Sequence, residues 1–265
     1  GEGETAGYVL ARNSGEGTDR KPQAGDVELT KTEIRDILAL NQKYERFVLV
    51  LNVGGMVNLE PVNAVGTVLL LGQLGSATGD AFADVLLGRA YPSGKLTMTW
   101  APIGEYASTE GFGDPNDTEY KEGIYVGYRY FDTFHVAPRY PFGYGMSYTT
   151  FDVTTENAAW KPDAKPKTIT VTVKVTNTGS CAGKEVVQVY AACPSGKLKK
   201  ERKRLVAFGK TALLQPGESE TLHLKVPTAL LESYRTGKAV YCMEAGNYDF
   251  LVGTSSRDVT LAARL

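Results

Sequence analysis

The sequence has few of the residues that build metal sites and disulfide frameworks. Its 265 residues include three cysteines and two histidines, and their spacing does not match a zinc site. No apolar run approaches the roughly 20 residues that a membrane-spanning helix requires. The formal net charge of -1 gives the whole protein no attraction to nucleic acid or to an anionic membrane surface. We therefore expect no metal, no cofactor, no nucleic acid and no membrane partner.

The three cysteines indicate a reducing compartment. Cys181 and Cys193 flank one predicted strand, so they lie far beyond the ~7 Å limit for a disulfide. A Cys193–Cys242 bridge stays open, but three reduced thiols in a cytoplasmic protein are favoured. The acidic start at residues 1–4 (GEGE) is not followed by an apolar core, so we expect no secretory leader. We expect a cytoplasmic location, with secretion as the alternative.

The first half of the chain alternates strand and helix signals, which predicts a parallel sheet with helices on both faces. A capping box at residues 30–33 (TKTE) predicts a helix that runs to about Tyr44. Residues 47–52 and 67–71 are continuous apolar runs, typical of strands that are covered on both faces. Such a sheet normally has more strands, so we expect the chain to begin inside a larger domain. The other expected elements are a strand at 8–12, a helix at 80–87 and a strand at 96–100.

We assign residues 1–148 to this α/β sandwich domain, including an aromatic-rich linker at about 101–148. The linker is rich in Gly, Pro and Tyr, and aromatic side chains bury large areas. Packing between two domains is the favoured role of these rings, and stacking on sugar rings is the alternative. Glu122 and Arg129 are expected to form a structural ion pair.

Residues 149–265 read as an all-β domain. Apolar residues at 169, 171, 173 and 175 alternate with polar ones, which indicates a half-buried strand. Residues 215–218 (QPGE) match a type II turn. The other expected strands are at 185–191, 205–208, 210–214, 222–226, 248–252 and 258–261. About seven strands at this spacing predict an immunoglobulin-like sandwich.

Two polar features of this domain are best explained as solvent-exposed surface rather than as functional sites. His223 falls on the outward face of its strand, so we expect it to be solvated. Residues 197–204 (KLKKERKR) contain six basic residues and one acid. A nucleic-acid patch is conceivable, but nothing else in the chain supports it, and a solvated hairpin loop is favoured.

One loop places a carboxylate between two glycines just past a predicted strand. Residues 13–20 (NSGEGTDR) follow the strand at 8–12, and ligands of open α/β sheets bind beyond the carboxyl ends of strands. Glycine lets another surface approach the backbone closely. Glu16 is therefore a candidate catalytic acid, although most such triplets are solvated loops. A phosphate cradle is rejected because Glu16 would repel a phosphate and the next helix begins too late.

Many ordered motifs resemble those of family 3 glycoside hydrolases, the β-glucosidase family, outside their catalytic barrel. The matching segments are 13–20, 81–88 (AFADVLLG), 92–96 (PSGKL), 122–130 (EGIYVGYRY), 141–148 (PFGYGMSY), 175–179 (VTNTG), 183–190 (GKEVVQVY) and 205–211 (LVAFGKT). The resemblance implies a parallel-sheet α/β sandwich followed by a fibronectin type III-like domain. It also implies that Glu16 matches the family's general acid/base, while Asp19 and Arg20 shape the loop.

The resemblance implies that the catalytic machinery is incomplete in this sequence. The family's nucleophile is an Asp on a (β/α)8 barrel, and this sequence contains no such barrel. A retaining glycosidase needs two carboxyl groups about 5–5.5 Å apart. Asp19 lies too near Glu16 in sequence to be the second one, and Asp80 and Asp84 on the predicted helix suit packing.

The function implied is therefore a part of a retaining β-glucosidase that hydrolyses terminal, non-reducing β-D-glucosyl residues. Its partners would be a β-glucoside or short oligosaccharide and a barrel on another segment or chain. A β-xylosidase is the near neighbour within the family. The alternative class is a non-catalytic carbohydrate-binding or scaffolding module, and a homo-oligomer stays open.

Overall fold

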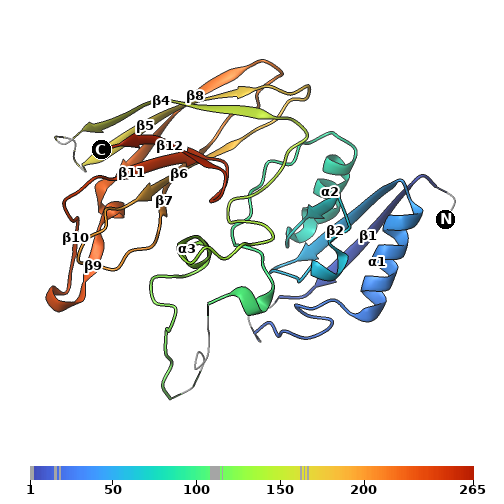
Figure 1. Ribbon diagram of the computed structural model, residues 1–265. Coiled ribbons are helices and arrows are strands. Elements are labelled where there is room, and N and C mark those ends of the chain that lie inside the picture. The colour runs from blue at the N-terminus through green and yellow to red at the C-terminus, as the bar shows by residue number, and fades with distance from the viewer. Residues whose placement is uncertain are drawn as a thin grey trace. The chain divides into compact units, whose positions relative to one another are not determined.

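The computed structural model describes residues 3–14, 17, 19–107, 114, 116–161, 163, 165 and 167–265. The chain divides into two compact units (Figure 1). Unit 1 contains Gly1–Ala90 and Trp100–Gly104, and unit 2 contains Tyr91–Thr99 and Glu105–Leu265. The predicted α/β plus all-β class is confirmed, because unit 1 holds a parallel sheet and unit 2 holds antiparallel sheets. The domain division at residue 148 stays a prediction.

The sheet of unit 1 has the strand order β1-β2-β3 and is parallel throughout. Its strands are β1 (Thr5–Arg12), β2 (Arg46–Val53) and β3 (Val68–Leu70). In β2, the middle strand, the consecutive residues Leu49, Val50 and Leu51 are at most 1% exposed. Because consecutive side chains point to opposite faces, both faces of β2 are covered, as the apolar run predicted. Parallel pairing also brings the carboxyl ends of the three strands to one edge of the sheet.

Both helices expected in unit 1 are present. They are α1 (Lys31–Lys43) and α2 (Thr78–Leu86). Thr30 caps α1: its hydroxyl accepts from the Glu33 N–H at 3.2 Å, and the Glu33 carboxylate accepts from the Thr30 N–H at 2.8 Å. This reciprocal pair confirms the predicted capping box. Ile37 on α1 is fully buried against the sheet, so the cap and the apolar face together fix this helix.

The strand expected at 96–100 is wrong. Leu96 instead forms two backbone hydrogen bonds with the 143–144 segment. It donates to the Tyr144 carbonyl and accepts from the Gly143 N–H, each at 2.8 Å. The physical reason is that this run straddles both units, since Thr99 belongs to unit 2 and Trp100 to unit 1. An apolar run that is shared between two cores need not be one element.

Unit 2 is a sandwich of two antiparallel sheets with the orders β4-β5-β8 and β12-β11-β6-β7 (Figure 1). The strands are β4 (Phe151–Lys161), β5 (Thr168–Asn177), β6 (Val186–Ala192), β7 (Arg204–Lys210), β8 (Ser219–Pro227), β11 (Asp249–Gly253) and β12 (Val259–Arg264). Val171, Val173 and Val175 on β5 are fully buried, and their polar neighbours are not. The predicted period of two is therefore confirmed, and these valines join Phe250 in the core between the sheets.

Other predictions in unit 2 need correction. The run at 210–214 is not a strand: β7 ends at Lys210, and Leu214 forms only an isolated bridge with Gly183. The type II turn is confirmed, since Gly217 has φ +81° and Glu218 N donates to Gln215 O at 2.9 Å. Strand β4 and a short hairpin were not predicted from the sequence. The hairpin strands are β9 (Ser233–Arg235) and β10 (Val240–Cys242).

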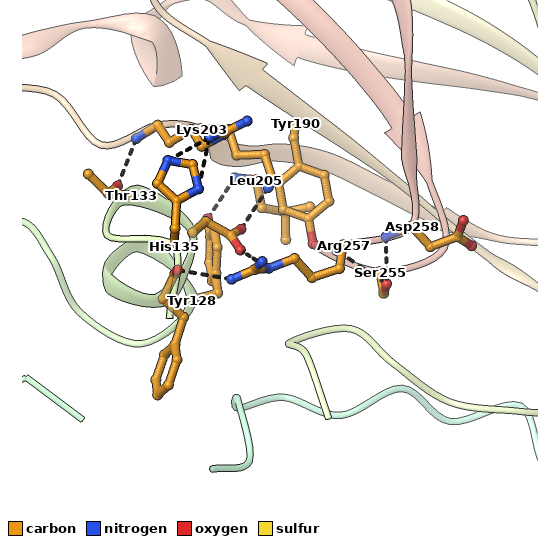
Figure 2. Close-up of polar contacts among 12 residues, drawn as sticks. Tyr128, Thr133, His135, Tyr190, Lys203, Leu205, Ser255, Arg257 and Asp258 are labelled. Atoms are coloured by element: carbon orange, nitrogen blue, oxygen red, sulfur yellow. Dashed lines mark hydrogen bonds and ion pairs between the residues drawn. The ribbon is translucent and has the colours of Figure 1, made fainter. Parts of the chain in front are cut away.

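The aromatic-rich segment packs on the sandwich and contains a short helix, α3 (Tyr128–Thr133). The Tyr128 ring stacks on Phe142 at 4.7 Å and meets the edge of Tyr190 at 5.8 Å. The Tyr128 hydroxyl accepts from the Leu205 N–H at 2.7 Å (Figure 2). These rings lie within unit 2, where Tyr190 is buried and Tyr128 and Phe142 are half-buried. Packing between domains stays a prediction.

The expected Glu122–Arg129 ion pair is wrong. Arg129 faces Glu201 at 3.9 Å instead. Among the described residues, the Glu122 Oε2 atom has no hydrogen-bond partner. Glu201 comes from the loop between β6 and β7, far along the sequence, so the pair could not be inferred from local spacing.

The basic run at 197–204 is not a fully solvated loop. The side chains of Lys200 and Lys203 are only 7% and 8% exposed, and they pair with Glu244 and Asp132. Asp132 also pairs with Arg257, so α3 is tied to two other segments of unit 2 (Figure 2). Distant carboxylates therefore pair with Lys200 and Lys203, while Lys197, Lys199 and Arg202 are exposed, so the expectation of a solvated loop holds for only part of the run.

The remaining polar expectations hold. His223 is exposed, and its Nδ1 lies 3.2 Å from the Thr172 hydroxyl. Cys181, Cys193 and Cys242 are all free thiols. The open question of a Cys193–Cys242 bridge is thereby answered in favour of reduced cysteines.

Candidate functional site

The candidate site lies at the carboxyl edge of the sheet of unit 1. Glu16 itself, with Gly15 and Thr18, lies outside the described residues, whereas Ser14, Gly17 and Arg20 are described. The chain leaves β1 at Arg12 and enters the loop at this edge. Gly17 is exposed, and a Cβ atom built on it would meet nothing within 4 Å. The backbone beside the candidate acid is therefore open to an approaching surface.

Arg20 joins both ends of the Glu16 loop to the body of unit 1. Its Nη1 donates to the Ser14 hydroxyl at 3.2 Å, and its Nη2 donates to the Met56 carbonyl at 3.3 Å. Its Nε pairs with the Asp26 carboxylate. Because Ser14 precedes Glu16 and Arg20 follows it, these bonds close the loop at its base. The loop-shaping role expected for Arg20 matches this geometry.

Asp26 is the second anchor of the loop. Its carboxylate accepts from the Lys21 N–H at 2.6 Å as well as from Arg20. The Lys21 N–H and then the Arg20 guanidinium lower the pKa of Asp26. Arg12 supports the same turn, since its Nε donates to the Asp26 carbonyl at 2.8 Å.

Arg12 also links the end of β1 to the start of α1. Its Nη1 and Nη2 reach the two Glu33 carboxylate oxygens at 2.9 and 2.8 Å, a bidentate arrangement. Burial alone would raise the pKa of Glu33, but the bonds from Arg12 and the Thr30 N–H outweigh it and lower the pKa. Glu33 is therefore committed to structure and is not a free acid for catalysis.

The loops after β2 and β3 make room for these side chains. A Cβ atom on Gly54 would lie 2.7 Å from the Gln73 Cδ and 2.9 Å from the Ser14 Cβ. A Cβ atom on Gly55 would lie 3.0 Å from Arg20 Nη1. A side chain at Gly54 would force Gln73 or Ser14 to shift, and one at Gly55 would press on Arg20, because the loops that follow all three strands meet here. Such a meeting point is where open α/β sheets bind ligands.

The other carboxylates that the sequence raised are Asp19, Asp80 and Asp84. Asp19 is exposed and makes no hydrogen bond or ion pair with another described residue. Asp80 and Asp84 both lie on α2, where Asp84 faces Arg89 at 3.8 Å. In the described part of the chain no cluster of His, Cys, Asp or Glu could hold a metal ion. No helix among those residues is long and apolar enough to cross a membrane.

Several residues that surround the loop were not predicted from the sequence, namely Asp26, Gly54, Gly55, Met56 and Gln73. A usable signal existed for some of them. Gly54, Gly55 and Gln73 all follow directly after an apolar strand run. Because parallel strands end at one edge, residues just past each run can be grouped from the sequence alone. Asp26 carries no comparable signal.

Comparison with known proteins identifies the family. The model of the glycosyl hydrolase family 3 C-terminal domain matches residues 3–148. The chain belongs to glycoside hydrolase family 3. A fibronectin type III-like domain model matches residues 185–256 of this family 3 chain, within the β-sandwich of unit 2.

Similar proteins support this membership. Beta-glucosidase A of Butyrivibrio fibrisolvens is 38% identical to 97% of this family 3 chain, which covers 36% of that protein. The structure of beta-glucosidase 3B from Thermotoga neapolitana with alpha-D-glucose is 40% identical, with a TM-score of 0.91. It matches 100% of this chain, which covers 38% of that structure. An exo-alpha-(1->6)-L-arabinopyranosidase of Bifidobacterium longum is 36% identical over 85% of this chain, which covers 29% of that protein. The chain thus spans about a third of the length of its relatives.

Proposed function

We propose that this chain supplies the general acid/base, Glu16, to a retaining β-glucosidase. The supporting observation is the 3.2 Å hydrogen bond from Arg20 Nη1 to the Ser14 hydroxyl, which joins the two residues that flank Glu16 in sequence, just past the carboxyl end of β1. The nucleophile in this proposal is an Asp on a (β/α)8 barrel in another segment or chain. The substrate is a β-glucoside or short oligosaccharide with a terminal, non-reducing glucose.

In this proposal Glu16 acts as an acid in the first chemical step and as a base in the second. In the first step the barrel Asp attacks the anomeric carbon while Glu16 gives its proton to the leaving oxygen. In the second step Glu16 takes a proton from water, which displaces the Asp from the sugar. Closure of the barrel over the loop removes water from Glu16. Loss of water raises the pKa of a carboxyl group, which keeps the acid protonated for the first step.

Arg20 and Asp26 serve this chemistry by position. Neither is proposed to touch the substrate, because the Arg20 guanidinium is occupied by Ser14, Met56 and Asp26. Gly54 and Gly55 leave room for the side chains of the loops that follow β1 and β3. Holding a reacting group in the correct place accounts for a large part of enzymatic rate.

Reconstitution with a barrel that carries the nucleophile tests this function. An aryl β-glucoside with a poor leaving group should be hydrolysed after mixing, and Glu16→Gln should abolish most of that activity. Sugar binding by this chain alone, insensitive to Glu16→Gln, would support a carbohydrate-binding module instead. Full activity of the Glu16→Gln assembly would support a scaffold. Since one relative is an arabinopyranosidase, an aryl α-L-arabinopyranoside and an aryl β-xyloside belong in the same assay.

We also propose that the protein works in the cytoplasm. Its support is the free state of Cys181, Cys193 and Cys242, because exposure to an oxidising compartment favours disulfides. Fractionation of the native host, with this protein detected by antibody, tests this location. Recovery in the culture medium would favour secretion.

A further inference from the structure

Unit 2 contains a surface cavity that the proposed chemistry does not use. Its volume is about 420 Å³, within the range of sites that hold small molecules. Arg202 and Lys203 reach it from the loop between β6 and β7, and His135 reaches it from the segment after α3. Arg257 reaches it from the turn between β11 and β12. Figure 2 shows His135, Lys203 and Arg257 converging from these three segments.

Positive charge is in excess around this cavity. Its lining contains Arg202, Lys203 and Arg257, against the carboxylates of Asp132 and Asp249. Asp249 is already matched by Arg264, whose Nε and Nη2 lie 2.5 and 2.8 Å from its two oxygens. Asp132 is therefore the one remaining carboxylate in a lining that contains three cationic side chains, and it pairs with two of them, Lys203 and Arg257.

The balance at Asp132 leaves one buried cation poorly compensated. Asp132 is 3% exposed and pairs with both Lys203, at 2.7 Å, and Arg257. Burial lowers the pKa of Lys203, and although Asp132 opposes this, Arg257 and Arg202 add to it. An anion in the cavity would offset this repulsion. The shape of the cavity and the charge of its lining thus both favour an anionic ligand.

The guanidinium groups keep donors that can reach such a ligand. Arg257 Nη2 donates to the Phe131 and Val136 carbonyls at 2.9 and 2.8 Å, and its Nη1 makes no bond to a described residue. The Arg202 side chain is exposed, and only its Nη1 is engaged, 3.1 and 3.3 Å from the two His135 nitrogens. Free edges of guanidinium groups bind carboxylate or phosphate oxygens in pairs.

Part of the cavity wall is apolar. Ala192, Leu251 and Val259 contribute to the lining. A bare inorganic ion would leave this wall without a contact. A ligand with both an oxyanion and a carbon skeleton would use both parts of the cavity.

We propose that this cavity binds a small organic anion, whose carboxylate or phosphate head group is held by Arg202, Lys203 and Arg257 and whose carbon body lies against Leu251 and Val259. The site is a second ligand site, separate from Glu16 and in the other unit of the chain. It rests on different observations from the proposed glucosidase function, so either can fail without the other.

Calorimetric titration of the 265-residue chain tests this site with three probes of similar size. The probes are glucose 6-phosphate, glucuronate and uncharged glucose, each in chloride at constant ionic strength. Saturable binding of glucose 6-phosphate, glucuronate or both, in excess over glucose, is expected. The two anions also distinguish a phosphate head group from a carboxylate. Equal affinities for all three probes, or no binding of any of them, would overturn the proposal.

Substitution of an exposed arginine links that binding to the cavity. Arg202→Gln should lower the affinity for the anion by about tenfold or more, the loss expected for one charge-assisted hydrogen bond. The matched control is Arg235→Gln, an exposed arginine on β9 outside the cavity lining. Equal losses in the two variants would show a general charge effect and refute the site. Arg202 is exposed, so neither substitution removes a buried contact.

Discussion

Arg20 shows how a single residue can join the two ends of a loop to the rest of its unit. It bonds Ser14, Met56 and Asp26, so it spans the base of the loop that contains Glu16. The pKa of Asp26 is lowered first by the Lys21 N–H and then by Arg20. The stabilisation from Asp26 is therefore present above its unfolded-state pKa and is lost as the pH falls through its folded-state pKa.

Replacing Arg20 by methionine should raise the pKa of Asp26 towards its ordinary value. The Lys21 N–H bond and the charge of Arg12 would then still lower it, without the contribution of Arg20. The measurement is a carboxyl-carbon NMR titration of Asp26 in the two proteins. Arg35→Met is the control, because Arg35 is exposed and pairs only with its neighbour Asp36. An Asp26 titration curve that Arg20→Met leaves in place would contradict the anchoring role.

Asp132 is the residue on which the attachment of α3 depends. It is nearly fully buried between Lys203 and Arg257. Asp132→Asn leaves these cations without a counter-charge, so the free energy of unfolding should fall by about 3 kcal/mol. Urea unfolding measures this loss, with exposed Asp152→Asn on β4 as the matched control. Equal stabilities of the two variants would show that the buried ion pairs contribute nothing.

At the scale of single elements, α1 depends on its cap. Thr30→Ala removes the hydroxyl that accepts from the Glu33 N–H. The expected cost is about 0.5–2 kcal/mol in the free energy of unfolding. Hydrogen exchange of the first-turn amides of α1 should report it. Thr32→Ala, two residues further on and exposed, should have no such cost, and a shared loss would argue against the cap.

The elements that sequence predicted are those whose signals are local. The capping box of α1 and the alternation in β5 need only neighbouring residues, and both were correct. β4 was not predicted because it is mostly exposed and because its alternation of inward and outward side chains breaks at a bulge between Thr155 and Asn157. The run at 96–100 misled because its residues belong to two units. Element type is thus predictable where one core determines it.

At the scale of the whole molecule, the sequence located the candidate loop but not its surroundings. Glu16 stood out because it lies between glycines after a strand. The residues that hold its loop come from Asp26, Met56 and the glycines after β2, and only folding brings them together. The basic run at 197–204 shows the same limit, since its partners Asp132 and Glu244 are distant in sequence.

The chain covers about a third of its relatives, so its proposed function is a contribution to a larger assembly. We propose that this contribution is the carboxyl group of Glu16. A general acid acts only while protonated, so activity that depends on it falls as the pH rises above its pKa. Removing the acid should therefore flatten the alkaline limb of the pH profile. The same removal should matter most for leaving groups that need a proton.

The most direct measurement compares the Glu16→Gln assembly with the unaltered assembly on two aryl β-glucosides. On the poor leaving group, turnover of the first chemical step should fall by roughly 10²–10⁴-fold. On a dinitrophenyl leaving group, which needs no proton, that step should change little. Glu45→Gln, which alters an exposed carboxylate of unit 1, should change neither. Unaltered turnover of the Glu16→Gln assembly on the poor leaving group would contradict the proposed role of Glu16.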